Sequence, residues 1–200
     1  MPIFQYGTRE IDYLRSRDEK LGAAIERIGM IEREVIPDPF KAIISSVVGQ
    51  QISQKAADTV RTRLTNLVGE ITPESIVQAS IDELRSCGLS ARKASYIKGI
   101  ADAAVSGEVD FANLHTLTDE EIIRRLTSLK GVGIWTAEMV LIFSLGRMDV
   151  VSYSDLAIRR GMMKLYGLEE LTKEQFNQYR TRYSPYGSVA SLYLWRLAGQ

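Results

Sequence analysis

Apolar residues in this chain recur mainly at the three- and four-residue spacing of a helix. Two such faces are formed by Phe40, Ile43, Ile44 and Val47, and by Ala57, Val60, Leu64, Leu67 and Val68. Alternation of apolar and polar residues is scarce. The stretch 149–153 is strand-like but too isolated to build a sheet. The pattern therefore predicts an all-α protein of about ten short helices.

Residues that start or stop helices mark the boundaries. Capping boxes, in which a Ser or Thr precedes a Glu or Gln by three positions, occur at Ser80 with Glu83, Thr118 with Glu121, and Thr172 with Gln175. Thr72 and Pro73 suit the N-cap and first turn of another helix, and Ser90 opens one that runs toward Gly107. We therefore expect short helices joined by tight turns.

Composition excludes several kinds of site. The chain has 200 residues, 45% apolar and 25% charged, so we expect one globular unit over 1–200, with room for two small lobes. Its single cysteine and single histidine, Cys87 and His115, exclude an intrachain disulfide framework, a four-cysteine iron–sulfur cluster and a multi-histidine zinc site. No apolar run reaches roughly 18 residues and no leader is evident, so we expect a cytoplasmic protein with no membrane partner.

The segment 129–133, Leu-Lys-Gly-Val-Gly, carries the first functional signal. Gly131 and Gly133 flank one apolar residue, which permits a tight turn and close approach of another backbone. Gly133 leads into a helix predicted from Ile134 to about Leu145, and the unpaired N–H groups at such a start form an anion site. Taken alone, the two glycines favour an ordinary turn between helices. The net charge of zero argues against binding nucleic acid through bulk charge, but not against such a local site.

Residues further along favour DNA. The run Leu-Lys-Gly-Val-Gly-Ile-Trp-Thr-Ala at 129–137 resembles the helix-hairpin-helix signature of the DNA glycosylase superfamily that includes endonuclease III. In that family a catalytic aspartate follows at the start of a later helix, and Asp155 occupies that place here. The segments 48–57 and 88–94 resemble two further parts of the family pattern, so the resemblance covers about 35–200. It implies two helical lobes around a DNA-binding cleft.

The residue two positions after the second glycine indicates the subclass. Lyase-competent members of the family carry a catalytic lysine there, whereas this chain has Trp135. Without that amine the Schiff-base route to strand cleavage is closed. Trp135 instead resembles the bacterial 3-methyladenine DNA glycosylase II branch, although the extra N-terminal sheet domain of that branch has no room here. The resemblance implies a compact monofunctional enzyme for alkylated purines such as 3-methyladenine and 7-methylguanine.

The resemblance also implies roles for individual side chains. Asp155 is the candidate catalytic carboxylate, which would stabilise the positive charge that develops on the sugar. Its position before Leu156 is also that of a plain N-cap for a helix over 156–166. A charged base needs little protonation to leave, so one acid suffices. Aromatic walls would favour a cationic base, and the base-pocket candidates are Trp135, Met139, Tyr153, Tyr186 and Trp195.

The predicted DNA contacts involve the hairpin and the 50–51 loop. By resemblance, Gln51 is the wedge that fills the gap left by a flipped base. The candidate DNA-binding residues are Gln50, Gln51, Lys130, Gly131, Gly133 and Thr136, and Arg92, Lys93, Arg159 and Arg160 would add local positive charge. The family's hairpin often holds a monovalent cation, Na or K, through backbone carbonyls that match Thr127, Leu129 and Val132. No cofactor is required.

The expected partner is double-stranded DNA with a damaged base, bound by a monomer associated with the nucleoid. Three alternatives stay open. One is a bifunctional glycosylase, for which Lys130 is the nearby lysine. The second is a non-catalytic helix-hairpin-helix protein that senses lesions. The third is a glycosylase for uracil, hypoxanthine or 8-oxoguanine. Residues 1–37 are predicted only to form helices that pack on the main body.

Overall fold

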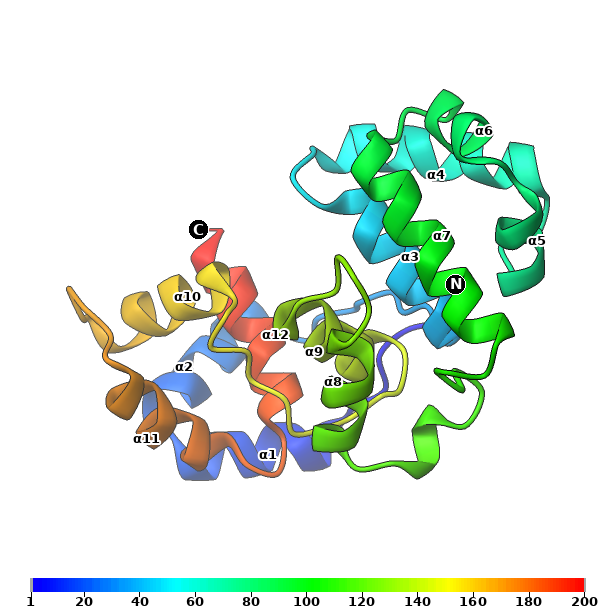
Figure 1. The fold of residues 1–200 in the computed structure, drawn as a ribbon. Coiled ribbons are helices and arrows are strands. Elements are labelled where there is room, and N and C mark those ends of the chain that lie inside the picture. Colours follow the sequence, from blue (N-terminus) through cyan, green and yellow to red (C-terminus); the bar gives the residue numbers. More distant parts are fainter. Residues whose placement is uncertain (1, 200) are drawn as a thin grey trace. The chain divides into compact units, whose positions relative to one another are not determined.

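The computed structural model describes residues 2–199 and confirms the all-α prediction (Figure 1). Within that range there are twelve α-helices and one 3-10 helix, and the only β pairing is an isolated bridge between Ile3 and Glu34. Twelve α-helices agree with the predicted number of about ten, and they include the short helices expected after Thr72 and Ser80 and the helices expected in residues 1–37.

The chain forms two compact units. Unit 1 consists of the described parts of Met1–Val35 and Gly146–Gln200, and unit 2 is Ile36–Leu145. The prediction that residues 1–200 act as a single glycosylase unit stays a prediction.

Unit 2 contains the two apolar faces predicted from the sequence. Phe40, Ile43, Ile44 and Val47 are all buried, as are Ala57, Val60 and Leu64. Leu67 shares the predicted apolar face but is 39% exposed, because it lies near the end of its helix. The capping boxes at Ser80 and Thr118 are confirmed. The helices are α3 (Pro39–Gly49), α4 (Gln54–Val68), α5 (Pro73–Gln78), α6 (Ile81–Ser86), α7 (Ala91–Val105), the 3-10 helix η1 (Leu114–Thr116), α8 (Asp119–Thr127) and α9 (Ile134–Phe143).

Unit 1 joins two N-terminal helices to three C-terminal ones. These are α1 (Thr8–Arg17), α2 (Glu19–Ile28), α10 (Leu156–Tyr166), α11 (Lys173–Tyr183) and α12 (Gly187–Ala198). The buried Asp18 carboxylate, at the start of α2, accepts a hydrogen bond from the Tyr166 hydroxyl at 2.7 Å. A Cβ on Gly161 would overlap the carbonyl of Leu194, so the backbones of α10 and α12 touch there. This close crossing fixes α10 against α12 within the unit.

The strand-like stretch 149–153 pairs with no other strand among the described residues, as expected of so isolated a run. The segment is irregular, because side chains of α12 satisfy its backbone in place of a partner strand. The Val150 N–H donates to Ser188 Oγ at 3.0 Å, and Ser191 Oγ donates to the Val150 carbonyl at 3.0 Å. Both serines are fully buried. The segment that leads into α10 is therefore held on α12.

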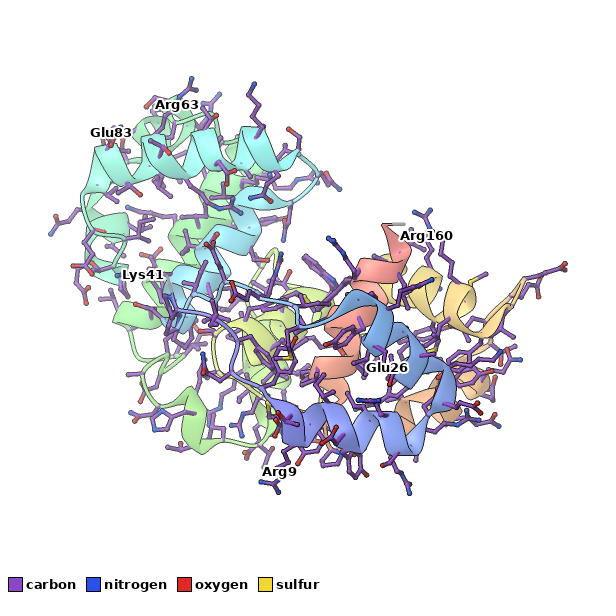
Figure 2. The ribbon with its side chains drawn as sticks, turned by 180° about the vertical axis from the view of Figure 1, so that it is seen from behind. Arg9, Glu26, Lys41, Arg63, Glu83 and Arg160 are labelled. Atoms are coloured by element: carbon purple, nitrogen blue, oxygen red, sulfur yellow. The ribbon has the colours of Figure 1, made fainter. Side chains whose placement is uncertain are left out.

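Charged side chains cover the surface of both units, as Figure 2 shows for Arg9, Glu83 and Arg160 among others. No helix in the described part of the chain combines the length and the apolar character that crossing a bilayer requires. Among residues 2–199, no cluster of three or more His, Cys, Asp or Glu side chains has a geometry that could hold a metal ion.

Candidate functional site

The start of α10 carries the candidate catalytic carboxylate. Asp155 is the N-cap of this helix, and its Oδ1 accepts the Ile158 N–H at 3.0 Å. Its side chain is buried, and only 7% of the residue is exposed. The helix spans Leu156–Tyr166, which matches the predicted 156–166. The capping role is therefore real, and it leaves the second carboxylate oxygen for another partner.

That partner is Trp195, forty residues further along the chain. The indole Nε1–H of Trp195, on α12, donates to Asp155 Oδ2 at 3.0 Å. Each carboxylate oxygen thus accepts one N–H, so the position and plane of the carboxylate are set by two different elements. The crossing of α10 and α12 at Gly161 lies close by, since the carbonyl in contact there belongs to Leu194. The structure brings Asp155 and Trp195 together as predicted, and it also shows that the indole is a hydrogen-bond donor to the carboxylate.

Tyr153 lies two residues before Asp155 and packs on α11. Its ring meets Phe176 edge-on, with 5.0 Å between centroids. The Arg159 guanidinium lies 5.3 Å from the Tyr153 centroid, and the Lys173 ammonium lies 5.8 Å from it. Two cations already use this π system, so a cationic base would be repelled there. The prediction of Tyr153 as a cation-attracting wall is therefore weakened, and Arg159 is drawn to the ring instead of toward a phosphate.

Tyr186 lies at the opposite end of α12 from Trp195. It is the N-cap residue of that helix, nine residues before Trp195, which corresponds to about 13 Å along the axis. Its ring packs edge-on against Tyr13 of α1, with centroids 5.2 Å apart. The structure therefore does not bring Tyr186 to the carboxylate, and its assignment to one pocket with Trp195 is corrected.

In unit 2, the predicted hairpin joins α8 to α9. Gly131 has φ of 85°, and a Cβ there would overlap the Tyr96 ring, so only glycine fits. Gly133 is the N-cap of α9 but has no side chain to cap it. The first N–H groups of α9 therefore lack a capping acceptor from that residue, which is the condition for an anion site. Lys130 is exposed beside them.

Two other hairpin predictions have different outcomes. Thr136 is only 3% exposed, which contradicts a phosphate contact through its side chain. Trp135 is 39% exposed on the first turn of α9, and Met139 is half-buried one turn later, so their base-pocket roles stay predictions.

The carbonyls of Thr127, Leu129 and Val132 lie where α8 ends and the hairpin begins. Carbonyl oxygens at a helix C-terminus carry partial negative charge, and no N–H of a following helical turn binds them. The Leu129 carbonyl accepts the Val132 N–H at 3.2 Å and keeps a second lone pair. The oxygens present therefore suit a monovalent cation.

The loop between α3 and α4 carries the predicted wedge. Gln51 is exposed, and its φ is 57°. The Gln50 side chain is turned toward the hairpin, since its Nε2–H donates to the Gly131 carbonyl at 3.0 Å. The prediction placed both glutamines at the DNA, whereas the structure uses the Gln50 side chain to join the loop to the hairpin.

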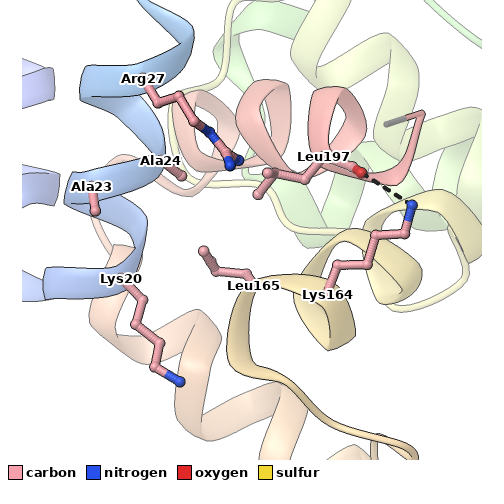
Figure 3. A pocket seen from close by; sticks show the side chains of 7 residues that line it. All are labelled: Lys20, Ala23, Ala24, Arg27, Lys164, Leu165 and Leu197. Atoms are coloured by element: carbon pink, nitrogen blue, oxygen red, sulfur yellow. Dashed lines mark hydrogen bonds between the residues drawn. The ribbon is translucent and has the colours of Figure 1, made fainter.

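A pocket of about 540 Å³ lies among α2, α10 and α12 of unit 1 (Figure 3). It is lined by Lys20, Ala23, Ala24, Arg27, Lys164, Leu165 and Leu197. One of the lysines that line the pocket, Lys164, caps the end of α12, since its Nζ donates to the Leu197 carbonyl at 3.4 Å. None of the predicted site residues lines this pocket, and it is separate from the candidate site.

Sequence reasoning missed the task of Lys93, which was grouped with the surface cations. Its ammonium binds backbone carbonyls at the end of α3. The spacing of residues along one chain does not show such a contact, because the donor and acceptors lie on different helices. The only available signal was the resemblance of 88–94 to a family segment.

Comparison with known proteins shows similarity over most of the chain. Residues 44–185 match the family model described as HhH-GPD superfamily base excision DNA repair protein. DNA-3-methyladenine glycosylase 1 of Schizosaccharomyces pombe is 38% identical over 164 residues, which cover 80% of this chain and 72% of that protein.

Two solved structures are similar in fold as well. DNA-3-methyladenine glycosidase from Bacillus halodurans has a TM-score of 0.88 at 38% identity, covering 100% of this chain and 94% of that one. A 3-methyladenine DNA glycosylase of Schizosaccharomyces pombe in complex with abasic DNA has a TM-score of 0.85 at 34% identity, covering 94% of this chain and 96% of that one. The similarity noted at residues 129–137 therefore extends well beyond the hairpin.

Proposed function

Because this chain belongs to the HhH-GPD superfamily of base excision DNA repair proteins, we propose that it is a monofunctional DNA glycosylase that removes alkylated purines from duplex DNA. The observation that carries the proposal is the buried Asp155 carboxylate, fixed by two N–H donors at the start of α10. Relatives named for 3-methyladenine support the substrate class.

Asp155 acts on the sugar. As the N-glycosidic bond breaks, its electron pair leaves with the base and positive charge builds on C1′ and the ring oxygen of the deoxyribose. A carboxylate beside C1′ stabilises that charge, and water then adds to C1′ and loses a proton. The donors from Ile158 and Trp195 keep the carboxylate in one orientation, so little reorganisation is needed as the charge develops.

The leaving base explains why one acid is enough. A purine alkylated at N3 or N7 is already cationic in DNA, so the departing electron pair neutralises it. The base therefore leaves without a proton from the protein. Uracil and 8-oxoguanine are neutral, so their departure needs a proton or another source of stabilisation for the leaving base. A site with a single carboxylate therefore favours alkylated purines as substrates.

The start of α9 binds a DNA phosphate. Gly133 offers no side-chain cap to the backbone N–H groups that follow it, and the positive end of the helix dipole lies there. Gly131 lets the hairpin turn tightly, and the exposed Lys130 adds charge. Gln51 fills the space of the flipped base. This arrangement needs no net positive charge on the protein.

Strand cleavage by the enzyme itself is not part of the proposal. The position that carries the lysine of lyase-competent relatives holds Trp135, whose indole cannot form a Schiff base. The product is an abasic site in an intact strand.

A monovalent cation at the hairpin is part of the same proposal. The carbonyls of Thr127, Leu129 and Val132 would hold Na or K, and the ion would supply positive charge next to the phosphate. Exchange of K for a bulky organic cation should weaken DNA binding at constant ionic strength. An unchanged dissociation constant would remove the ion from the proposal.

Base release from alkylated DNA tests the proposed activity. Duplex DNA treated with a methylating agent is incubated with the protein, the free bases are chromatographed, and nicks are scored before and after alkali. Release of 3-methyladenine or 7-methylguanine, with nicks only after alkali, is expected. Nicks before alkali would refute the monofunctional assignment, and no release would refute the substrate class. Light scattering of the protein–DNA complex should give one chain per duplex.

A further inference from the structure

The turn between α3 and α4, residues 50–53, holds one residue in a left-handed backbone conformation. Gln51 has φ of 57°, and it is the one non-glycine residue with positive φ among residues 2–199. A side chain with a Cβ disfavours this conformation, so it persists only where the surroundings hold it. Because Gln51 is the proposed wedge, whatever holds this turn decides where the wedge points.

Lys93 of α7 holds the turn from one side. Its Nζ donates to the Val48 carbonyl at 2.8 Å and also to the Gln50 carbonyl. Both carbonyls lie at the C-terminal end of α3, where backbone oxygens have no helical partner and the helix dipole is negative. Burial lowers the pKa of Lys93, and the two oxygens replace part of the solvation that the ammonium has lost.

The Gln50 side chain holds the turn from the other side. Its Nε2–H donates to the carbonyl of Gly131, the residue at which the hairpin reverses. Gln50 is therefore bound twice, through its carbonyl to Lys93 and through its amide to the hairpin. The neighbouring Gln51 has its side chain exposed. The contacts around this turn thus leave one side chain projecting from a fixed base.

We propose that Lys93 is a positioning residue for base flipping, which holds the turn so that Gln51 projects as the wedge while Gln50 couples the turn to the phosphate-binding hairpin. The inference rests on the proposed function. It replaces the sequence-based view of Lys93 as one of several surface cations, because the ammonium is held in place by two carbonyls at the end of α3, which take up two of its three N–H donors.

Lys98 provides a matched control on the same helix. Its Nζ donates to the carbonyls of Ile76, Val77 and Ala79, at the end of α5. The chemistry is the same as at Lys93, a lysine of α7 that caps the C-terminus of another helix. None of the residues proposed to contact DNA lies at that end of α5. Replacing Lys98 therefore reports the cost of losing such a cap without disturbing the wedge.

The test compares paired and unpaired lesions. Lys93→Met, Lys93→Arg and Lys98→Met are assayed for base release from a duplex with a paired lesion and from one with the same lesion in a bulge, where extrusion costs less. A 2-aminopurine beside the lesion reports loss of stacking on binding, independently of base release. Thermal unfolding by circular dichroism reports the fold. Lys93→Gln, which keeps two N–H donors, serves if the Met variant does not fold.

For Lys93→Met we expect paired-lesion release to fall roughly tenfold or more, since a charge-assisted hydrogen bond is lost, with a much smaller fall on the bulge and a loss of the 2-aminopurine signal. Lys93→Arg should keep the ratio of paired-lesion to bulged-lesion release close to that of wild type. Lys98→Met should keep the wild-type ratio even if its melting temperature falls. Equal losses on both substrates, or an unchanged 2-aminopurine signal, would overturn the inference. A wild-type protein that unstacks the lesion but releases no base would refute the glycosylase proposal instead.

Discussion

Two helix starts carry the proposed function, and they are built in opposite ways. The helix α9 begins after Gly133, which offers no side chain to its first N–H groups. The helix α10 begins after Asp155, whose carboxylate caps the Ile158 N–H and is held by Trp195. The same backbone feature, the first N–H groups of a helix, receives no cap from the N-cap residue in one unit and is capped by a carboxylate in the other.

The difference separates two uses of a helix N-terminus. A start whose N-cap residue has no side chain can attract an anion from outside, because that residue offers its N–H groups and dipole no acceptor. In a start capped by aspartate, a backbone N–H of the helix instead binds the carboxylate and holds a negative charge of the protein in place. The first arrangement suits a phosphate of the DNA, and the second suits the positive charge of a sugar that is losing its base. Substitutions at Gly133 and Asp155 can change one start at a time.

Removing the charge at α10 while keeping its cap should have the largest effect. Asn caps helices about as well as Asp, so Asp155→Asn should fold, with a modest fall in melting temperature because its amide N–H2 faces the indole N–H of Trp195. Base release should fall by about 10²–10³-fold or more, because the sugar loses its stabilising charge. DNA binding should persist in a gel-shift assay. Variant and wild type with equal release would leave Asp155 as a plain cap.

Closing the open start at α9 should come next. The backbone at Gly133 has φ of −95°, and nothing lies within 4 Å of a Cβ there, so Gly133→Asp should fold and should cap α9. We expect DNA affinity to fall by about tenfold or more, because a carboxylate takes the place of the phosphate. Gly133→Ser, a neutral cap, should lose less. Fluorescence anisotropy with labelled duplex measures both, and unchanged affinity in the Asp variant would exclude this start as the phosphate site.

Loosening the carboxylate at α10 should have a smaller effect. Trp195→Phe keeps an aromatic ring but removes the N–H that binds Asp155 Oδ2. We expect kcat to fall by about tenfold to a hundredfold with little change in KM, since a hydrogen bond to a charged group is lost. The loss should be equal for cationic 3-methyladenine and neutral hypoxanthine. A higher KM for the cationic lesion alone would show that Trp195 acts as a wall for the base.

The start of α8 offers a purely structural reference for the starts of α9 and α10. The Thr118 N–H donates to the Glu121 carboxylate and holds the pKa of Glu121 below its usual value. The charged form is therefore favoured in the folded state, so this stabilisation is present above the unfolded pKa of about 4.3 and is lost as the pH falls through the lower folded pKa. Glu121→Gln should shift the urea midpoint slightly at neutral pH and not at all in strong acid, with base release unchanged. A shift that persists in acid would mean that charge is not the cause.

Local signals predicted most of the helices and their starts. The capping boxes and the position of Asp155 before Leu156 depend on residues a few positions apart, and the structure confirms them. The family resemblance added the hairpin and the subclass. The strand-like pattern at 149–153 does not show how its backbone is paired, because the hydrogen bonds come from buried serines about forty residues away.

Side-chain contacts between distant helices could not be predicted from the sequence. Nothing local to Trp195 indicates that its indole donates to Asp155, and nothing local to Lys93 indicates that it binds the end of α3. The distance of Tyr186 from Trp195 could have been inferred, since nine residues on one helix separate them widely. The limit was therefore set by side-chain partners from distant segments.

The order in which the two units occur along the chain also bears on how the protein is made. Unit 2 is one continuous stretch, Ile36–Leu145, whereas unit 1 needs residues from before and after it. On the ribosome the hairpin side can fold as soon as it emerges, while α1 and α2 wait for α10 and α12 to be synthesised. The unit with the proposed phosphate site can thus fold before the unit that holds the Asp155 carboxylate, which is completed only after α12 has been synthesised.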